Sequence, residues 1–347
     1  MDQYIQLLQK LIETPSISRE EEHTAQIIHD FFASHSIETQ RIKNNVIVRN
    51  KHFTQDKPLI LLNSHHDTVK PNASWKKDPF FPLIIDRRLY GLGSNDAGGP
   101  LVALMAAFMH FYDHKNLPYN LIFTATAEEE ISGKNGVALV LPHLGPIEFA
   151  IVGEPTRLKM AIAEKGLMVL DCTVRGQSGH AARDEGENAI YNALDDIHWF
   201  QSYRFDRQSD LLGAMKMSVT VINAGTQHNV VPDECRFVVD LRTTDAYTNE
   251  EILDIIAKNV QCEVVPRSTR LQASGLPGGH LLLALAKKLK IDTFGSPTLS
   301  DQALMPFPSV KIGPGDSARS HTADEFIELD EIRGGMELYL KMLKALL

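Results

Sequence analysis

The chain has 347 residues, of which 43% are hydrophobic and 23% are charged, as in an ordinary globular protein. This length exceeds what one hydrophobic core usually spans, so two domains are expected. The net charge of −9 argues against nucleic acid as a partner, and no apolar run approaches the length of a membrane span.

The first half of the chain alternates helical and strand patterns. Residues 1–13 predict a helix, and Ser18 with Glu21 forms a capping-box pattern that predicts a second helix from there to about residue 35. The apolar run 58–64 is typical of a strand buried in a parallel sheet. Other strands are predicted at 44–50, 119–127 and 149–152, and a buried helix at 100–112. The alternation predicts an α/β fold with a mixed, largely parallel sheet covered on both faces.

The pattern changes near residue 165. Predicted strands and helices then follow in a β-α-β-β-α-β order, which is typical of a compact two-layer α+β unit. They lie at 167–175, 187–203, 215–225, 234–243, 248–260 and 262–266. A helix beginning within 278–289 and an amphipathic helix at 328–347 close the chain. We therefore predict one domain formed by residues 1–165 and 271–347, interrupted by a smaller inserted domain of residues 166–270.

The cysteines and the N-terminus both bear on the compartment. Cys172, Cys235 and Cys262 form no C-x-x-C pair, and a sparse, odd number favours a reducing compartment over a disulfide scaffold. The amphipathic N-terminal pattern lacks the apolar segment of a signal peptide. A cytoplasmic protein is expected.

Histidine and acidic side chains recur just past the apolar runs. The motifs are His65-His66-Asp67, Asp96, Glu129-Glu130, Glu154, His180 and His321. Such a set, with Gly-rich turns beside it, is the composition of a zinc site built for hydrolysis. Two residues apart at a strand end, His65 and Asp67 point to the same side, where a carboxylate can hold the second ring nitrogen of a metal-binding histidine.

Each motif alone has an ordinary explanation. His65 with Asp67 matches a common surface pair, and Asp96 matches an Asn-Asp turn, although four glycines around it favour a special backbone. Runs such as Glu128-Glu129-Glu130 are mostly solvated. This run ends an apolar strand, where mutual repulsion is costly unless cations offset it.

The ordered segments resemble the two-zinc family of aminoacylases, deacetylases and carboxypeptidases, over essentially the whole length. They are SHHDTV, DPFFPLIIDRRLYGLGSNDAGG, TATAEEEISG, GEPT, GQSGHAAR, NVVPDECRFVVDLR and GPGDSARSHTADEF. Within the family, WKKDPFFPLIIDRRLYGLG and TATAEEE look most like the acetylornithine deacetylase branch. The resemblance implies a metallopeptidase-like catalytic domain interrupted by a dimerisation domain.

The resemblance also implies a role for each motif residue. His65 and Glu154 bind one metal ion, Glu130 and His321 bind a second, and Asp96 bridges the two. Asp67 orients His65, and Glu129 is the general base. A charge count agrees, because two Zn²⁺ ions are neutralised by Asp96, Glu130, Glu154 and a hydroxide, which leaves Glu129 free to accept a proton. The peptide bond after Asp96 is implied to be cis.

The inserted domain carries three further candidates. By resemblance, His180 reaches the active site of a partner subunit and stabilises the oxyanion, the alternative being a capped loop histidine. Arg242 could clamp a substrate carboxylate, with a structural salt bridge as the alternative, and Asn229 is a second substrate-binding candidate. The chain departs from the family pattern at Glu128, where Asp is frequent, and at Ala97-Gly98, where Met-Lys is frequent.

The expected activity is removal of an acetyl or succinyl group from a small amino acid. The leading candidate substrate is N-acyl-L-ornithine, in arginine biosynthesis. Two divalent metal ions are expected, zinc first and cobalt or manganese as alternatives, in a homodimer. Asp301 and Asp316 are candidate partners for the substrate's δ-ammonium, with helix capping as an alternative for Asp301. Other activities left open are a succinyl-diaminopimelate-type desuccinylase, a general aminoacylase, a short-chain peptidase and a non-catalytic metal-binding protein.

Overall fold

The computed structural model describes residues 1–183 and 185–347, which divide into two compact units. Unit 1 comprises Met1–Ile162, Gly275–Phe294 and Ser300–Leu347, and unit 2 comprises Ala163–Ser274 and Gly295–Leu299. The prediction placed residues 163–165, 271–274 and 295–299 in the first domain, whereas the structure groups them with unit 2. Among the described residues, no helix combines the length and the apolar character needed to span a bilayer.

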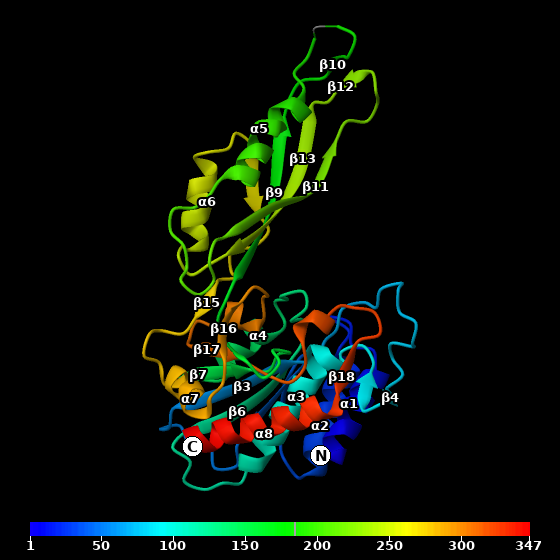
Figure 1. Cartoon of the computed structure of the whole chain (residues 1–347). Coiled ribbons are helices and arrows are strands. Elements are labelled where there is room, and N and C mark those ends of the chain that lie inside the picture. Colours follow the sequence, from blue (N-terminus) through cyan, green and yellow to red (C-terminus); the bar gives the residue numbers. More distant parts are fainter. Residues whose placement is uncertain (184) are drawn as a thin grey trace. The chain divides into compact units, whose positions relative to one another are not determined.

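Unit 1 contains a mixed, mostly parallel α/β sheet (Figure 1). Its strands run in the order β1 (Gln40–Ile42), β2 (Asn45–Arg49), β6 (Asn120–Thr126), β3 (Leu59–His65), β7 (Phe149–Val152), β17 (Ser309–Lys311) and β8 (Met160–Glu164), and two short strands extend it beside β8, β15 (Ser274–Gly275) and β16 (Thr293–Ser296). Strand β3 pairs in parallel with β6 and β7, so these three strands end at one edge of the sheet.

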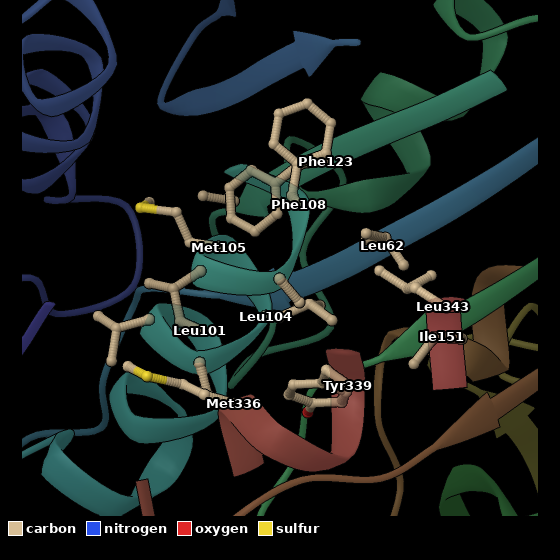
Figure 2. Packing of buried hydrophobic residues seen from close by; sticks show 14 of the residues in the cluster. Leu62, Leu101, Leu104, Met105, Phe108, Phe123, Ile151, Met336, Tyr339 and Leu343 are labelled. Atoms are coloured by element: carbon tan, nitrogen blue, oxygen red, sulfur yellow. The ribbon is translucent and has the colours of Figure 1, made fainter. Parts of the chain in front are cut away.

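Helices cover both faces of this sheet, because successive side chains of each strand point to opposite sides. One face packs against α1 (Asp2–Glu13), α2 (Glu22–Ser34), α3 (Gly99–Phe111), α7 (Leu281–Leu289) and α8 (Leu329–Leu346). Leu62 and Ile151 point to this face and meet α3 and α8 residues such as Leu104 and Leu343 (Figure 2). Leu59 and Leu61 point to the other face, which is covered by α4 (Val137–Val140), η2 (Leu141–His143) and η3 (Asp301–Leu304).

A small antiparallel sheet in unit 1 was not predicted. It has the order β18 (Phe326–Glu328), β5 (Arg88–Tyr90) and β4 (Leu83–Ile85). Between β5 and α3 lies the short turn η1 (Ser94–Gly98), in which Asp96 and Ala97 have non-helical backbone angles, and between β17 and β18 lies the 3-10 turn η4 (Ser317–Arg319). The turn η1 carries the candidate ligand Asp96, and the candidate ligand His321 comes shortly after η4.

Unit 2 follows the predicted β-α-β-β-α-β order. A four-stranded antiparallel sheet runs β11 (Lys216–Ala224), β13 (Glu234–Thr243), β9 (Gly166–Arg175) and β14 (Glu263–Pro266). Helices α5 (Ala189–Ser202) and α6 (Asn249–Ala257) pack on one face through a core that includes Phe200, Phe237 and Ile256. A separate two-stranded ribbon is formed by β10 (Gly179–His180) and β12 (Val230–Val231).

Candidate metal centre

The candidate site lies at the edge of the unit 1 sheet where β3, β6 and β7 end. His65 is the last residue of β3 and pairs with Thr126, the last residue of β6, while Asn63 pairs with Val152, the last residue of β7. The segments that follow therefore leave the sheet together. They bring Asp67, Glu129-Glu130 and Glu154 to one place, as expected for the carboxyl ends of parallel strands.

His65 is held so that one ring nitrogen faces the cluster of carboxylates. Its Nδ1 lies 3.1 Å from the backbone carbonyl of Asp67, which only accepts, so Nδ1 carries the proton in the neutral ring. Its Nε2 faces Asp96 at 3.3 Å, Glu154 at 3.8 Å and Glu129 at 3.9 Å. Burial opposes protonation, yet the charge of Glu129 and the contacts with Asp67 and Asp96 raise the pKa of His65 well above its usual value.

Asp67 anchors the turn that carries the two glutamates. Its fully buried carboxylate accepts hydrogen bonds from the backbone N–H groups of Glu129 (3.0 Å) and Glu130 (3.1 Å) and from the Ser18 hydroxyl (2.7 Å). Burial opposes ionisation, but the contact with His65 and the Ser18 hydrogen bond lower the pKa of Asp67. The carboxylate therefore positions His65 and the Glu129-Glu130 turn together.

The predicted helix cap at Ser18 is wrong. The helix starts at Glu22, and no side chain caps it. Arg19 has a φ of 82°, which breaks the backbone path that a capping box needs, and the Ser18 hydroxyl is engaged by Asp67. Residue types suited to a cap are equally suited to a buried carboxylate partner, so the pattern alone cannot separate these uses.

Asp96 lies between the two histidines. Its Oδ1 is 3.3 Å from Nε2 of His65, and its Oδ2 is 3.7 Å from Nε2 of His321. The Asp96–Ala97 peptide bond is cis, which confirms the expectation. Two side chains fix the turn: Asn95 exchanges hydrogen bonds with the backbone of Asp316, and Glu325 accepts from the backbone N–H of Asp96.

Glu130 and His321 form the second cluster of donors. The two side chains lie 2.9 Å apart, and this contact is the first cause that raises the pKa of His321 to about 9. Ligand atoms of His65, Asp96 and Glu130 all lie within 4.8 Å of one another. The His321 backbone has a φ of 60°, which helps to turn the imidazole toward the site from an otherwise exposed loop.

The three consecutive glutamates have different surroundings. Glu128, with a φ of 55°, turns away and accepts hydrogen bonds from the backbone and side chain of Asn135. Glu129 and Glu130 face the histidines. Burial is the largest cause that raises the pKa of Glu129 well above its usual value, and it also raises the pKa of Glu130. The neighbouring acids add to both shifts.

These donors fit a pair of divalent cations. Imidazole nitrogens and carboxylate oxygens are the ligands of hydrolytic metal sites. Nε2 of His65 lies near Oδ1 of Asp96 and near Glu154, while Nε2 of His321 lies near Oδ2 of Asp96 and near Glu130. Four buried or nearly buried acids so close together repel one another, and +2 charges would offset that repulsion.

The remaining predicted residues occupy unit 2 or are engaged elsewhere. Exposed His180 accepts through Nδ1 from the N–H of Ala182, and the carbonyl of Asn229 accepts from the N–H of Ala181. Arg242 donates through Nε (2.9 Å) and Nη2 (3.1 Å) to Asp240. This is the structural salt bridge that was the alternative to a substrate clamp.

The two acids considered for the substrate's ammonium group have partners in unit 1. Asp316 pairs with Arg157 and caps η4. Asp301 is buried and accepts from Asn63 and Thr126, and η3 is capped by Ser300 instead. Neither carboxylate is therefore an uncommitted surface acid.

Sequence reasoning missed Ser18 and Glu325 as parts of this site. Glu325 belongs to the quoted segment GPGDSARSHTADEF, four residues after His321. Its spacing gave no sign of a role, because its partners are backbone N–H groups of a turn 230 residues away in sequence. Burial is the main cause that raises the pKa of the Glu325 carboxyl to about 8, and the negative charge of Asp96 is the second.

Comparisons with known proteins agree with this architecture. The profile of peptidase family M20/M25/M40 matches residues 61–345. Acetylornithine deacetylase of Proteus mirabilis (strain HI4320) is 27% identical, over 96% of this chain and 94% of the relative. Among solved structures, a tripeptidase from Staphylococcus aureus matches with a TM-score of 0.79 at 19% identity, covering 99% of this chain and 98% of its own.

A second solved structure is a dinuclear metal-binding peptidase of the M20 family from Bacillus subtilis. It matches with a TM-score of 0.74 at 18% identity, over 100% of this chain and 98% of the other. At these identities, the structural matches establish the fold, and the profile match establishes the family.

Proposed function

The chain belongs to peptidase family M20/M25/M40, and from this premise we propose that it removes the N-acyl group from a small amino acid, first of all N-acyl-L-ornithine, in arginine biosynthesis. Membership makes it a hydrolase of a metal-binding family. The observation that carries the narrower proposal is the similarity to acetylornithine deacetylase along nearly the full length of both chains. Zinc is the proposed metal, with cobalt and manganese as alternatives.

The proposed roles follow from the geometry of unit 1. His65 and Glu154 would hold one ion, His321 and Glu130 the other, with Asp96 between them. Bound divalent ions supply Lewis acidity that activates water and polarises an amide carbonyl. Glu129 reaches toward His65 without belonging to either group of ligands, so it is the proposed base. It would accept a proton from the attacking water and deliver it to the leaving amine.

We propose that the protein acts as a homodimer through unit 2. Strand β11 lies at the edge of its sheet and exposes Val221 and Ile222, and the exposed face of α5 carries Tyr191 and Leu194. A long apolar edge strand is a template for pairing, and a second copy offers the same edge about a twofold axis. His180 would then donate a hydrogen bond to the oxyanion in the partner's active site.

A peptidase activity is the second candidate, favoured by the tripeptidase among the similar structures. A kinetic panel on metal-loaded protein separates the two activities. The panel compares kcat/KM for N-acetyl-ornithine, N-succinyl-ornithine, N-acetyl-methionine and a tripeptide. A clear preference for the methionine compound would indicate a general aminoacylase, and a preference for the tripeptide would indicate a peptidase.

Identifying the residues that select the acyl group of the substrate requires a variant protein. A succinyl tail adds a carboxylate that a guanidinium can grip, and Arg242 with Asn229 are the proposed binding residues. A succinyl preference that disappears in Arg242→Ala would identify a desuccinylase. Arg236→Ala is the matched control, because Arg236 lies on the same strand and also pairs with an acid two residues away, Glu234.

A further inference from the structure

We propose that Glu325 is a positioning residue for both metal sites: its carboxylate holds the turn that presents Asp96 against the loop that presents His321. This inference rests on the two-metal centre of the proposed function and concerns no substrate. Glu325 was assigned no role by the sequence, and its side chain is almost completely buried, with 2% of the residue exposed.

Three backbone N–H groups of the Asp96 turn converge on this one carboxylate. Asn95 and Asp96 donate to Oε1 at 2.8 and 2.9 Å, and Gly93 donates to Oε2 at 3.1 Å. A buried carboxylate is costly unless its oxygens are hydrogen-bonded, and here both are. The contacts fix the backbone of the turn up to and including the residue that carries the ligand oxygens.

The position of Glu325 in the chain connects this turn with the second site. Glu325 comes four residues after His321, and its carbonyl accepts from the N–H of Gly91 just ahead of the turn. Asp96 turns Oδ1 toward His65 and Oδ2 toward His321. A shift of the Asp96 turn therefore changes the geometry on both sides of the carboxylate. Loss of the Glu325 carboxylate should then lower the affinity for both ions.

Glutamine is the sharpest substitution at this position. The amide keeps the shape of the side chain but offers a single acceptor oxygen. That oxygen can serve Asn95 and Asp96, and the NH₂ group then faces the N–H of Gly93, where two donors repel each other. Glu325→Asp tests the same contacts differently, because it keeps the charge and withdraws the carboxylate by one methylene.

The neighbouring residue supplies a matched control. Asp324 also accepts two backbone N–H groups, from Lys76 at 3.0 Å and Lys77 at 2.9 Å. Those residues belong to a loop that carries none of the proposed ligands. Asp324→Asn removes one acceptor oxygen next to Glu325 and should leave the Asp96 turn in place.

The experiment is a titration of the metal-free protein with Zn²⁺, in which calorimetry measures the affinity for each ion. Thermal unfolding is measured with and without metal. Absorption spectra of the Co²⁺-loaded protein report the coordination geometry. Loss of a hydrogen-bonding partner behind a ligand typically weakens metal affinity about 10- to 100-fold. We expect that loss for both ions in Glu325→Gln, together with an altered Co²⁺ spectrum. Asp324→Asn should bind both ions as the wild type does.

The inference is overturned if Glu325→Gln binds both ions with wild-type affinity, if only one ion is weakened, or if Asp324→Asn shows the same loss. Should the glutamine variant fail to fold, Glu325→Asp is judged by the same criteria. If the wild type itself fails to bind two ions, the proposed metal centre is wrong. If it binds two ions but hydrolyses no amide in the panel, only the proposed activity fails.

Discussion

The side-chain amide of Asn63 donates to the carboxylate of Asp301 at 2.8 Å, although 238 residues separate the two in sequence. The same oxygen of Asp301 accepts from the Thr126 hydroxyl at 2.7 Å. One buried acid thus joins the C-terminal ends of β3 and β6; β3 ends in His65, and β6 leads into the segment that carries Glu129. Burial is the largest cause that raises its pKa to about 6.

This raised pKa predicts a pH dependence of stability. The folded chain binds the Asp301 proton more tightly than the unfolded chain, whose pKa is near 3.8. The resulting stabilisation is full below pH 4 and is lost as the pH rises through 6. Asp301→Asn stays neutral, so the wild type should lose up to about 3 kcal/mol relative to it between pH 4 and pH 8. Urea denaturation of both metal-free proteins measures this; parallel curves would contradict the prediction.

Asp96→Ala should lower affinity at both metal sites, because its two oxygens face different histidines. Metal analysis after dialysis against a defined free Zn²⁺ concentration gives the stoichiometry. Asp113→Ala is the control, since Asp113 is an exposed acid that pairs with Lys51. One ion retained at wild-type affinity in Asp96→Ala would rule out a bridging role.

Glu129→Gln and Glu130→Gln should have different phenotypes although the residues are adjacent. The first should keep both metals and lose about 10²- to 10⁴-fold in kcat, the usual contribution of a general base. The second removes the partner of His321 and should weaken one ion. Metal content and kcat measured on both variants decide the matter, and exchanged phenotypes would show that the assigned roles are reversed.

Gly98→Ala should destabilise the Asp96 turn. A Cβ at this position would lie 2.4 Å from the carbonyl oxygen of Gly93, which accepts the Gly98 N–H, and 2.5 Å from Leu8. Overpacking of this kind costs about 1–3 kcal/mol. Gly278→Ala is the control, because nothing lies within 4 Å of its Cβ. Thermal unfolding should show a lower Tm for the first variant alone; equal Tm values would mean that the turn yields without cost.

His180→Ala and Glu129→Gln subunits should each be inactive and should regain activity when mixed. The reason is that unit 2 carries His180 but none of the proposed ligands, so a heterodimer would contain one complete site. Subunit exchange is verified by native mass spectrometry of differently tagged chains. If exchange occurs without recovered activity, His180 does not act in the partner's site.

Much of the fold was predictable because its signals are local. Strand β3 is a continuous apolar run, and its last residue, His65, marks the edge of the sheet where the site lies. In unit 2, strand β9 alternates buried residues with half-buried or exposed ones. Such periodicity depends on which side of an element faces the core, and the sequence displays it directly.

The missed elements depend on partners far away in the chain. Strand β5 has three residues and is stabilised by pairing with β18, more than 230 residues later. The turn at Asp96 is stabilised through Glu325, and the Glu129 turn through Asp67. Backbone N–H groups carry no sequence signature, so these anchors became visible only once the fold had brought the segments together.

The position of β17 has a consequence for protein synthesis. This strand pairs with β7 and with β8, although β7 ends at Val152 and β17 ends at Lys311. After β7 is complete, 159 further residues must be synthesised before β17 can pair with it, which takes roughly 10–30 s on the ribosome. Unit 2 is translated during this interval, while the nascent sheet of unit 1 presents an open apolar edge. We expect the nascent chain to be most prone to aggregation during this interval.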